Sequence, residues 1–448
     1  MTRTIAVFSA VCAILMFGTC GKDYREVINA PEELFYQGQE LEAARMLIPH
    51  INRAGKDQLL FLMEAGYLLH MAGKYEDSVK VLSKAASLAQ VVPVSISKEV
   101  AALLTNQTMT NYRGEDFEKV LVRMYLGINY LMLKKYEEAA VEFKAVNNEL
   151  QKIKNENGEA RYKQNIMAKY LAAIAHELRA DLDGSEDDRE FAVVEYRQIL
   201  NLRPDLAMAR RDLQNLSLGR TRDTGELVVI FQGGRCPVKE SRGKLLDDPS
   251  MYASLTAALG MQSLAAGVTA GSVMASLSMA ENPIPKFKIR SNKTKCLRVT
   301  VLGRQFMTET LENIEYTAQK NLEDNYQRLQ AKVAASIIVK AVAAAAAGIA
   351  AQQVTKSLAK DNSGLSSLVG LLVGAGTGTA LFATMKPDLR CWHTLPATLQ
   401  LGRMRLKPGK YTATIEYIGY NGAVQDVKHL NFEINNKEKY FINIRTVE

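Results

Sequence analysis

The feature that most constrains this 448-residue chain is a pattern of small and aromatic residues that follows position 112. Gly127 and Ala139 are small enough to let two antiparallel helices approach closely. Tyr130, Tyr136 and Phe143 are large enough to fill the space between that helix pair and its neighbour. The pattern predicts stacked helix pairs that present a surface for binding other proteins.

The offsets of these residues resemble those of tetratricopeptide (TPR) units. The first unit spans residues 59–90, and the second and best formed spans residues 120–151. A third unit is degenerate, with an acidic insertion at 179–189 between its two helices. We therefore expect an all-α, TPR-like solenoid over residues 21–220. The expected packing residues are Gly66, Tyr75, Gly127, Tyr130, Tyr136, Ala139 and Phe143.

The segment 91–119 between the first two units is too long for a TPR turn. Loops on a rigid scaffold commonly carry recognition, so this segment is the candidate partner-binding region. The candidate residues are Tyr112, Arg113, Glu115, Asp116 and Phe117. The alternative is structural, because Glu115, Asp116 and Glu118 can stabilise the start of the next helix through its dipole.

Residues 221–448 change to the alternating pattern of β-strands. Residues 226–231 are a β-branched run, and 410–417, 424–434 and 439–447 alternate toward the C-terminus. Pro408-Gly409, Asn421-Gly422 and Asn435-Asn436 separate these runs, and Pro-Gly and Asn-Gly are turn signals typical of hairpins. We expect a small antiparallel β-sandwich, which makes the fold class of the whole chain α+β.

Three segments inside this β region have an unusual composition. Residues 249–280 and 362–385 contain no charged side chain, and 307–360 reads as one long helix rich in alanine. We expect helical insertions at 249–280 and 307–385, the second a Gly/Ala-rich helical hairpin. Gly370, Gly374 and Gly378 recur every fourth residue as a glycine zipper against which another helix can pack. The hairpin can pack internally, drive formation of a homo-oligomer, or enter a membrane.

Residues 1–20 have the features of an export signal. The apolar stretch 5–17 has the length of a secretory signal core and is too short for a comfortable membrane span. Cys20 stands where a lipoprotein signal places its acylated residue, although Phe17 and Thr19 depart from the usual flanking residues. We expect Cys20 to be retained and to carry lipid such as palmitate, on the periplasmic side of the bacterial outer membrane. A plainly cleaved signal and an uncleaved anchor are the alternatives.

The charge and cysteine content argue against several other kinds of site. The net charge is +8, but Lys and Arg alternate with Asp and Glu, which favours a solvated surface over a nucleic-acid site. No Cys/His spacing of the zinc kind is present, so we expect no metal and no cofactor. Cys296 and Cys391 are candidates for a disulfide in an oxidising periplasm. Buried free thiols, Cys236 included, are the alternative.

Three motifs together resemble a known family. They are Tyr-Arg-Gly-Glu-Asp-Phe-Glu-Lys-Val at 112–120, the run 226–231 with Gly-Arg-Cys-Pro-Val-Lys at 234–239, and Asp-Leu-Arg-Cys-Trp-His-Thr-Leu-Pro at 388–396 leading to Leu-Lys-Pro-Gly at 406–409. The chain resembles uncharacterised TPR-containing lipoproteins of bacterial envelopes. That resemblance implies a scaffold attached to the outer membrane. Genes of the family lie beside those of lipoproteins similar to activators of peptidoglycan synthases, which implies a part in cell-envelope assembly.

We therefore expect a membrane-tethered periplasmic scaffold, not an enzyme, that binds envelope proteins through its repeats. The alternative is an oligomeric envelope component, such as a secretion or flagellar accessory, assembled through the glycine-striped helices. An enzyme would need Cys391 with His393, or Cys236, as a thiol nucleophile, and no third orienting group is evident. Arg390 and Trp392 are expected to be structural, with Trp392 filling the β domain.

Overall fold

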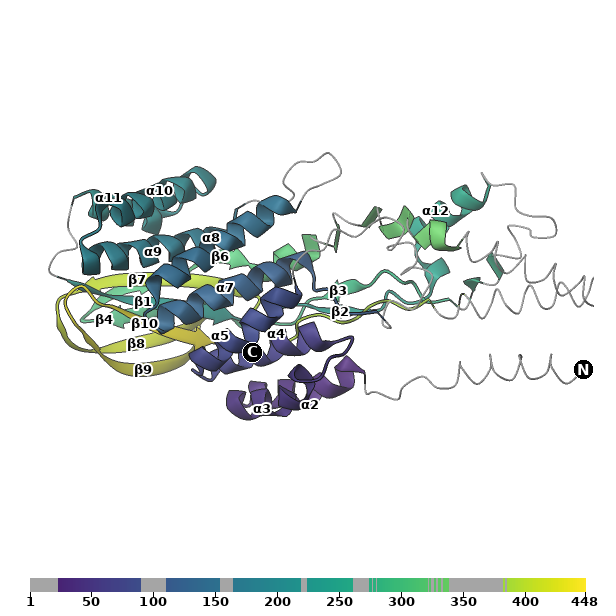
Figure 1. Ribbon diagram of the computed structural model, residues 1–448, viewed down its shortest axis with the longest axis horizontal. Coiled ribbons are helices and arrows are strands. Elements are labelled where there is room, and N and C mark those ends of the chain that lie inside the picture. The colour runs from purple at the N-terminus through teal and green to yellow at the C-terminus, as the bar shows by residue number, and fades with distance from the viewer. Residues whose placement is uncertain are drawn as a thin grey trace, which may run out of the picture.

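Helices form the first half of the chain and strands form most of the second half in the computed structural model (Figure 1). The structure describes residues 23–89, 110–153, 164–218, 224–260, 280–320 and 385–448, with scattered residues between 274 and 382. The helices of the first half are α2 (Tyr24–Tyr36), α3 (Glu40–Ile51), α4 (Gln58–Met71), α5 (Tyr75–Leu88), α7 (Asp116–Met132), α8 (Tyr136–Lys152), α9 (Ile166–Asp183), α10 (Glu186–Leu202) and α11 (Ala207–Ser217).

The two helices of a pair differ in how they are buried. In α4 every residue from Leu59 to Leu68 is buried, and α7 and α9 are buried almost as completely. In α8 the buried residues form one stripe, which includes Ala139, Phe143 and Val146. A helix that is apolar on all sides needs a cover beyond its own partner. We call the face formed by α4, α7 and α9 the inner face, and its cover is the C-terminal half of the chain.

Close contacts at glycine repeat along the array. A Cβ atom on Gly66 would lie 2.5 Å from a methyl of Leu82, and one on Gly127 would lie 2.5 Å from the ring of Phe143. In both pairs the filling residue follows the glycine by 16 positions, from 66 to 82 and from 127 to 143. The two helices of each pair therefore meet where only glycine leaves room, as in TPR-like units.

Two four-stranded sheets make up the β domain, which lies at the left of Figure 1. One sheet has the order β10-β1-β7-β6 and the other has the order β5-β4-β8-β9. Leu227, Val229 and Phe231 of β1 face Leu297 and other buried residues of the second sheet in a shared core. The strands are β1 (Gly225–Gly233), β4 (Thr294–Val301), β5 (Arg304–Met307), β6 (Glu309–Asn313), β7 (Thr398–Leu406), β8 (Gly409–Gly419), β9 (Val424–Ile434) and β10 (Lys439–Arg445). A separate two-stranded sheet pairs β2 (Val238–Glu240) with β3 (Lys286–Lys288).

The expectation of a purely antiparallel sandwich is wrong in one respect. Strand β10 pairs with β1 in parallel, with Val228 opposite Phe441 and Ile230 opposite Asn443. The physical reason is connectivity, because β10 follows β9 in sequence but belongs to the other sheet. The chain crosses between sheets at Asn435-Asn436 and does not turn back on itself there.

Only one of the expected hairpin turns joins neighbouring strands of one sheet. Asn421-Gly422 connects β8 to β9, with the Gly419 amide donating to the Ala423 carbonyl. Pro408-Gly409 instead connects β7 to β8, which lie in different sheets. A dipeptide predicts a turn locally, but which strands pair depends on the core between the sheets.

The expected helical insertions are corrected in part. Helix α12 (Pro249–Gly260) follows the short 3₁₀ helix η2 (Leu245–Asp247). The segment 307–360 instead starts at the end of β5 and continues with strand β6, and its residues 314–320 are helical. The sheet overrides helical propensity at β6, because Thr310 and its neighbours complete the edge beside β7. Gly370, Gly374 and Gly378 lie outside the described residues. Among the residues described, no helix is both long and apolar enough to cross a membrane.

Candidate functional site

The best-defined site is the interface between the inner face and the C-terminal half. Strands β1, β7 and β10, with the extended residues 386–397, lie against the helices α2 to α11. One hydrophobic cluster contains residues from both halves, among them Tyr67 and Tyr125 of the helices and Val228, Ile230 and Trp392 beyond them. Three groups of polar contacts line this interface.

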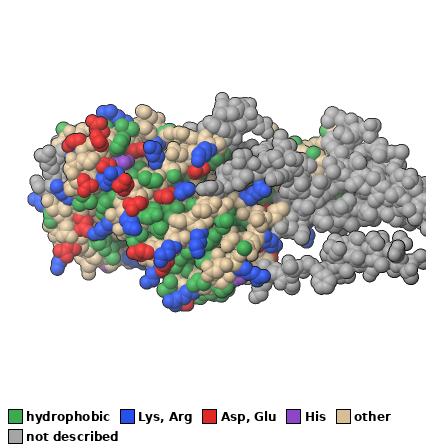
Figure 2. Space-filling view, in the orientation of Figure 1, with side chains coloured by type: hydrophobic (Ala, Val, Ile, Leu, Met, Phe, Trp, Pro, Cys, Tyr) green, Lys and Arg blue, Asp and Glu red, His purple; other side chains and the backbone are tan. Residues whose placement is uncertain are grey.

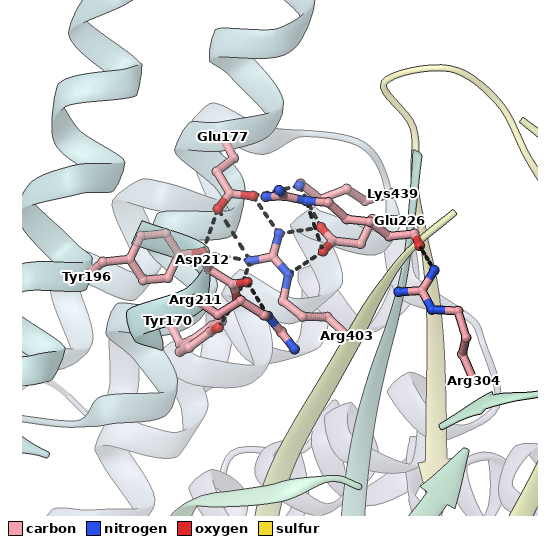
Figure 3. A network of polar contacts seen from close by, with 10 residues as sticks. Tyr170, Glu177, Tyr196, Arg211, Asp212, Glu226, Arg304, Arg403 and Lys439 are labelled. Carbon is pink, nitrogen blue, oxygen red and sulfur yellow. Dashed lines mark hydrogen bonds and ion pairs between the residues drawn. The ribbon is translucent and has the colours of Figure 1, made fainter. Parts of the chain in front are cut away.

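The first group is centred on Arg403 of β7 (Figure 3). Its guanidinium donates to Glu226 of β1 at 2.7 Å, to Glu177 of α9 at 2.6 Å and to the Tyr196 hydroxyl of α10 at 2.6 Å. Lys439 of β10 donates to the same two carboxylates, at 2.6 Å to Glu177 and 2.9 Å to Glu226. Helices and strands far apart in the sequence are thus joined by one charged cluster.

The charges of this group compensate one another. Burial alone would raise the pKa of both carboxyls. Arg403 and Lys439 overcome that effect, holding the pKa of Glu226 at about 2 and that of Glu177 well below its usual range. Asp212 of α11 adds a third carboxylate, 3.4 Å from Arg403, and accepts a hydrogen bond from Tyr170. A buried cluster of this kind is costly to break at any one member.

The second group is neutral and lies at the middle of the interface. The hydroxyls of Tyr67 and Tyr125 both donate to the side-chain oxygen of Gln232, at 3.0 and 2.9 Å. The Gln232 amide donates to Asn443 at 2.8 Å, and Asn443 contacts Nε2 of His70 at 2.8 Å. Burial lowers the pKa of His70 to about 4, which fits a neutral imidazole that accepts at Nε2.

The third group holds the extended segment before β7. Two buried carboxylates of the inner face accept backbone N–H groups from this segment, as a helix array accepts a bound peptide. Glu118 accepts from the amide of Trp392 at 2.7 Å, and Glu64 accepts from the amide of His393 at 2.6 Å. The Tyr24 hydroxyl also donates to Glu64, at 2.6 Å.

Charged side chains fasten this segment at two points. Arg390 donates to Asp57 at 2.8 Å and to Asp388 at 2.7 Å. His393 lies with Nδ1 3.1 Å from Glu32, which also accepts from Arg290 at 2.7 Å. The inner face of the array therefore carries the protein's own chain where a TPR protein would hold a partner.

Burial raises the pKa of the carboxyl groups of this third group and lowers that of its histidine, and neighbouring charges reverse the effect at two of them. Burial, with a smaller contribution from Glu115, raises the pKa of Glu118 to about 7, and burial also raises that of Glu64. For His393 burial acts to lower the pKa, but Cys391 and Glu32 outweigh it and raise the value to about 10. His393 and Arg290 hold the pKa of Glu32 at about 2 against the effect of burial.

The candidate partner-binding residues at 112–117 are engaged within the chain. Tyr112 is 7% exposed, donates to Glu118, and lies under the guanidinium of Arg390 at 5.2 Å. Glu115 starts α7 in a capping box with Glu118 and pairs with Lys239. Glu115, Asp116 and Glu118 thus lie at the start of α7, as the structural alternative describes. The remaining members are Asp116, which pairs with Lys119, Phe117, which is buried, and Arg113, which is exposed.

The candidate disulfide between Cys296 and Cys391 is not formed, and the alternative of buried free thiols holds for Cys236, Cys296 and Cys391 in the structure. Cys296 lies on β4, whereas Cys391 lies in the extended segment under the helices. Glu32 orients His393, a third group that the sequence did not reveal. However, Cys391 is 2% exposed and His393 is 6% exposed, so neither offers a reactive atom to a substrate.

The central residues of the site were missed by sequence reasoning. Arg403, Glu177 and Glu64 look like ordinary charged residues until their burial is known. One signal was available, because Glu64 stands within the otherwise apolar run 59–63 and 65–69 of α4. A carboxylate in a helix that is apolar on all sides indicates a buried partner.

The other expectations concern residues or groups beyond this site. Cys20 lies outside the described residues. Within the described part of the chain, no three His, Cys, Asp or Glu side chains are placed to hold a metal ion. On the face seen in Figure 2, acidic and basic side chains alternate over the helical array.

Comparison with known proteins leaves the family open. No family model matches the chain, and no curated protein matches it. MamA (residue 41 to the end) from Desulfovibrio magneticus RS-1 is 18% identical, with a TM-score of 0.30 over 45% of this chain and 86% of that one. A putative kinesin light chain with TPR-like repeats from Podosopora anserina is 11% identical, with a TM-score of 0.29 over 44% and 86%. A TPR protein from Parabacteroides merdae is 15% identical, with a TM-score of 0.20 over 44% and 73%. Scores this low carry no argument, so the TPR-like character of the helical half rests on its own helix pairs.

Proposed function

We propose that this protein is a non-enzymatic scaffold that is tethered to the periplasmic side of the outer membrane by lipid on Cys20 and binds other envelope proteins. The observation that supports partner binding best is a group of exposed apolar side chains on α10, outside the inner face. Trp392 and His393 donate backbone N–H groups to Glu118 and Glu64, so the usual peptide site of the array is filled from within. The surface left for partners is the outer face, formed by the second helix of each pair.

Helix α10 carries three exposed apolar residues of that outer face, among them the aromatic Phe191. Phe191 is 55% exposed, Val194 is 43% exposed and Leu202 is 36% exposed. Positions 191, 194 and 202 fall on one side of a helix with 3.6 residues per turn. Exposed apolar side chains grouped in this way are typical of protein interaction sites. We take this side of α10 as the partner surface of the scaffold.

Crosslinking in living cells tests this surface. A photoreactive amino acid placed at Phe191 or Val194 should capture the same envelope protein, identified by mass spectrometry. Tyr420 in the β8–β9 turn is a matched control, because it is 66% exposed but lies on the other domain. Equal capture at all three positions, or capture only at Tyr420, would contradict the assignment of the partner surface to α10.

The anchor needs a separate test. Labelled palmitate should be incorporated into the wild-type protein and not into Cys20→Ala, and only the wild type should fractionate with the outer membrane. If Cys20→Ala still incorporates labelled palmitate, the lipid is not attached at Cys20.

A further inference from the structure

The point at which the folded protein begins determines which of its surfaces meets a membrane. Two residues, Gly21 and Lys22, lie between Cys20 and Asp23, the residue before α2. At roughly 3.5 Å per extended residue, the three steps from Cys20 to Asp23 span at most about 10 Å. If lipid on Cys20 lies in a bilayer, the start of α2 must therefore lie beside the headgroups.

The start of α2 packs against the start of α4. The ring of Tyr24 lies 5.5 Å from that of Phe61, whose ring lies 4.7 Å from His50. Phe61 belongs to the first turn of α4, directly after the loop 52–57. This loop is therefore part of the surface from which the tether leaves.

Two separate segments bring cations to the same end. Lys56 of the loop accepts the backbone N–H of Tyr112 at its carbonyl, 2.6 Å away, which places Arg113 beside it. Arg390 donates to Asp57 at 2.8 Å and to the Thr110 carbonyl at 3.0 Å, which holds these two segments together. We call the three cations of these segments the basic rim: Arg53, Lys56 and Arg113.

The basic rim is open to solvent and has no acidic partner within the described part of the chain. Arg53 and Arg113 are exposed, Lys56 is half-buried, and none of the three forms an ion pair with another described residue. The acidic residues nearby are paired, as Glu115 is with Lys239, or lie on α2, where the exposed Asp23 and Glu26 flank Arg25. The balance of charge at this end is positive.

We infer that the basic rim is a docking surface for anionic lipid headgroups, which holds the start of α2 against the membrane. This inference rests on the proposed lipid anchor at Cys20, which would bring the rim within reach of the bilayer. Juxtamembrane Lys and Arg each add about 1 kcal/mol of attraction to an anionic surface, or about fivefold in partitioning, and lose it as salt screens the charges. The lipid on Cys20 would attach the protein to the membrane, and the basic rim would set the orientation of the protein on the membrane surface.

Vesicle binding by the chain from Gly21 onward, without acyl groups, tests the rim alone. Every contact described above lies within residues 23–448, so this chain retains them all. It should sediment with vesicles of phosphatidylethanolamine and phosphatidylglycerol in equal parts and not with phosphatidylcholine vesicles. Neutralising Arg53→Gln, Lys56→Gln and Arg113→Gln should each weaken binding about fivefold at low salt.

Matched cations at the other end provide the control. Lys407 and Lys410 are exposed in the β7–β8 connection, at the end of the β domain away from α2. The pair Lys407→Gln and Lys410→Gln should leave vesicle binding unchanged. No binding to the anionic vesicles, or an equal loss in the rim and control variants, would overturn the inference. Palmitate labelling of the full chain separates the two proposals. If Cys20 is acylated but the rim variants bind vesicles like the wild type, the docking role of the rim is wrong and the anchor stands. If the rim binds anionic vesicles but Cys20 is not acylated, the anchor is wrong and the lipid affinity of the rim stands.

Discussion

Arg403 on β7 donates to Glu177 on α9 across 2.6 Å, and both side chains are at most 1% exposed. The two residues lie 226 positions apart, and their contact joins the two halves of the molecule. Four other members share the cluster: Glu226, Lys439, Tyr196 and Asp212. The stability of the whole protein therefore depends on this contact between domains.

Removing the central cation should be severely destabilising. In Arg403→Met, Glu177 keeps only Lys439, and Glu226 keeps Lys439 and the more distant Arg405 at 4.0 Å, so two buried carboxylates are undercompensated. We expect a loss of about 3–5 kcal/mol in the free energy of unfolding, measured by urea denaturation. Arg298→Met is the control, because Arg298 pairs with Glu416 at the surface. That variant should unfold near the wild-type urea midpoint. A similar loss of unfolding free energy in both variants would show that the buried cluster does not stabilise the protein more than a surface ion pair does.

Glu118 should make stability depend on pH near neutrality. Its pKa is about 7 in the folded protein and about 4.5 when unfolded, so folding favours its protonated form. The stabilisation is complete below about pH 4.5 and is lost as the pH rises through 7, by about 3 kcal/mol for such a shift. Glu118→Gln should remove this part of the pH dependence of the urea midpoint. Glu33→Gln, at an exposed site on α2, should retain it.

Gly127 should not tolerate a methyl group. An added Cβ would lie 2.5 Å from the Phe143 ring, so Gly127→Ala must displace that ring or spread the two helices. We expect the thermal midpoint to fall, with a cost of about 1–3 kcal/mol. At Gly55 a Cβ would meet nothing within 4 Å, so Gly55→Ala is the matched control. A stabilised Gly127→Ala would mean that helix propensity outweighs packing there.

The two halves should unfold together. Trp392 is the only tryptophan, is 1% exposed, and lies with its ring 6.3 Å from Tyr67 and 6.1 Å from Tyr125. Its fluorescence reports the interface, while circular dichroism at the helix band reports the array. Because both halves share one core cluster, the two signals should change at the same urea concentration. An earlier fluorescence transition would show that the C-terminal half leaves the array first.

The three thiols should react only after unfolding. Burial raises the pKa of Cys236 well above its usual value and also raises that of Cys296. A thiol reagent added to the folded chain from Gly21 should modify almost none of them, because the thiolate is the reactive form. In denaturant all three should react, whereas a disulfide would leave a single reactive thiol.

Local pattern was enough to predict the helix pairs and most of the strands. The pairing of Gly127 with Phe143 and the alternation along β9 each involve residues that are close in the sequence. At such short range the backbone geometry of a helix or strand determines which side chains share a face. For the same reason Asn421-Gly422 was predicted to be a turn and is one. The structural role of Glu115, Asp116 and Glu118 at the start of α7 was also available from the sequence, because the stabilisation of a helix start is a local effect.

What only the tertiary structure decided is how distant segments meet. The parallel pairing of β10 with β1, the strand β6 in place of a helix, and the free Cys296 and Cys391 all depend on which elements share a core. Spacing in the sequence carries no information about Arg403 and Glu177, which are joined only when β7 lies against α9. The inner face therefore looked open in the sequence and is closed in the fold, because burying α4, α7 and α9 requires a cover that the protein supplies itself.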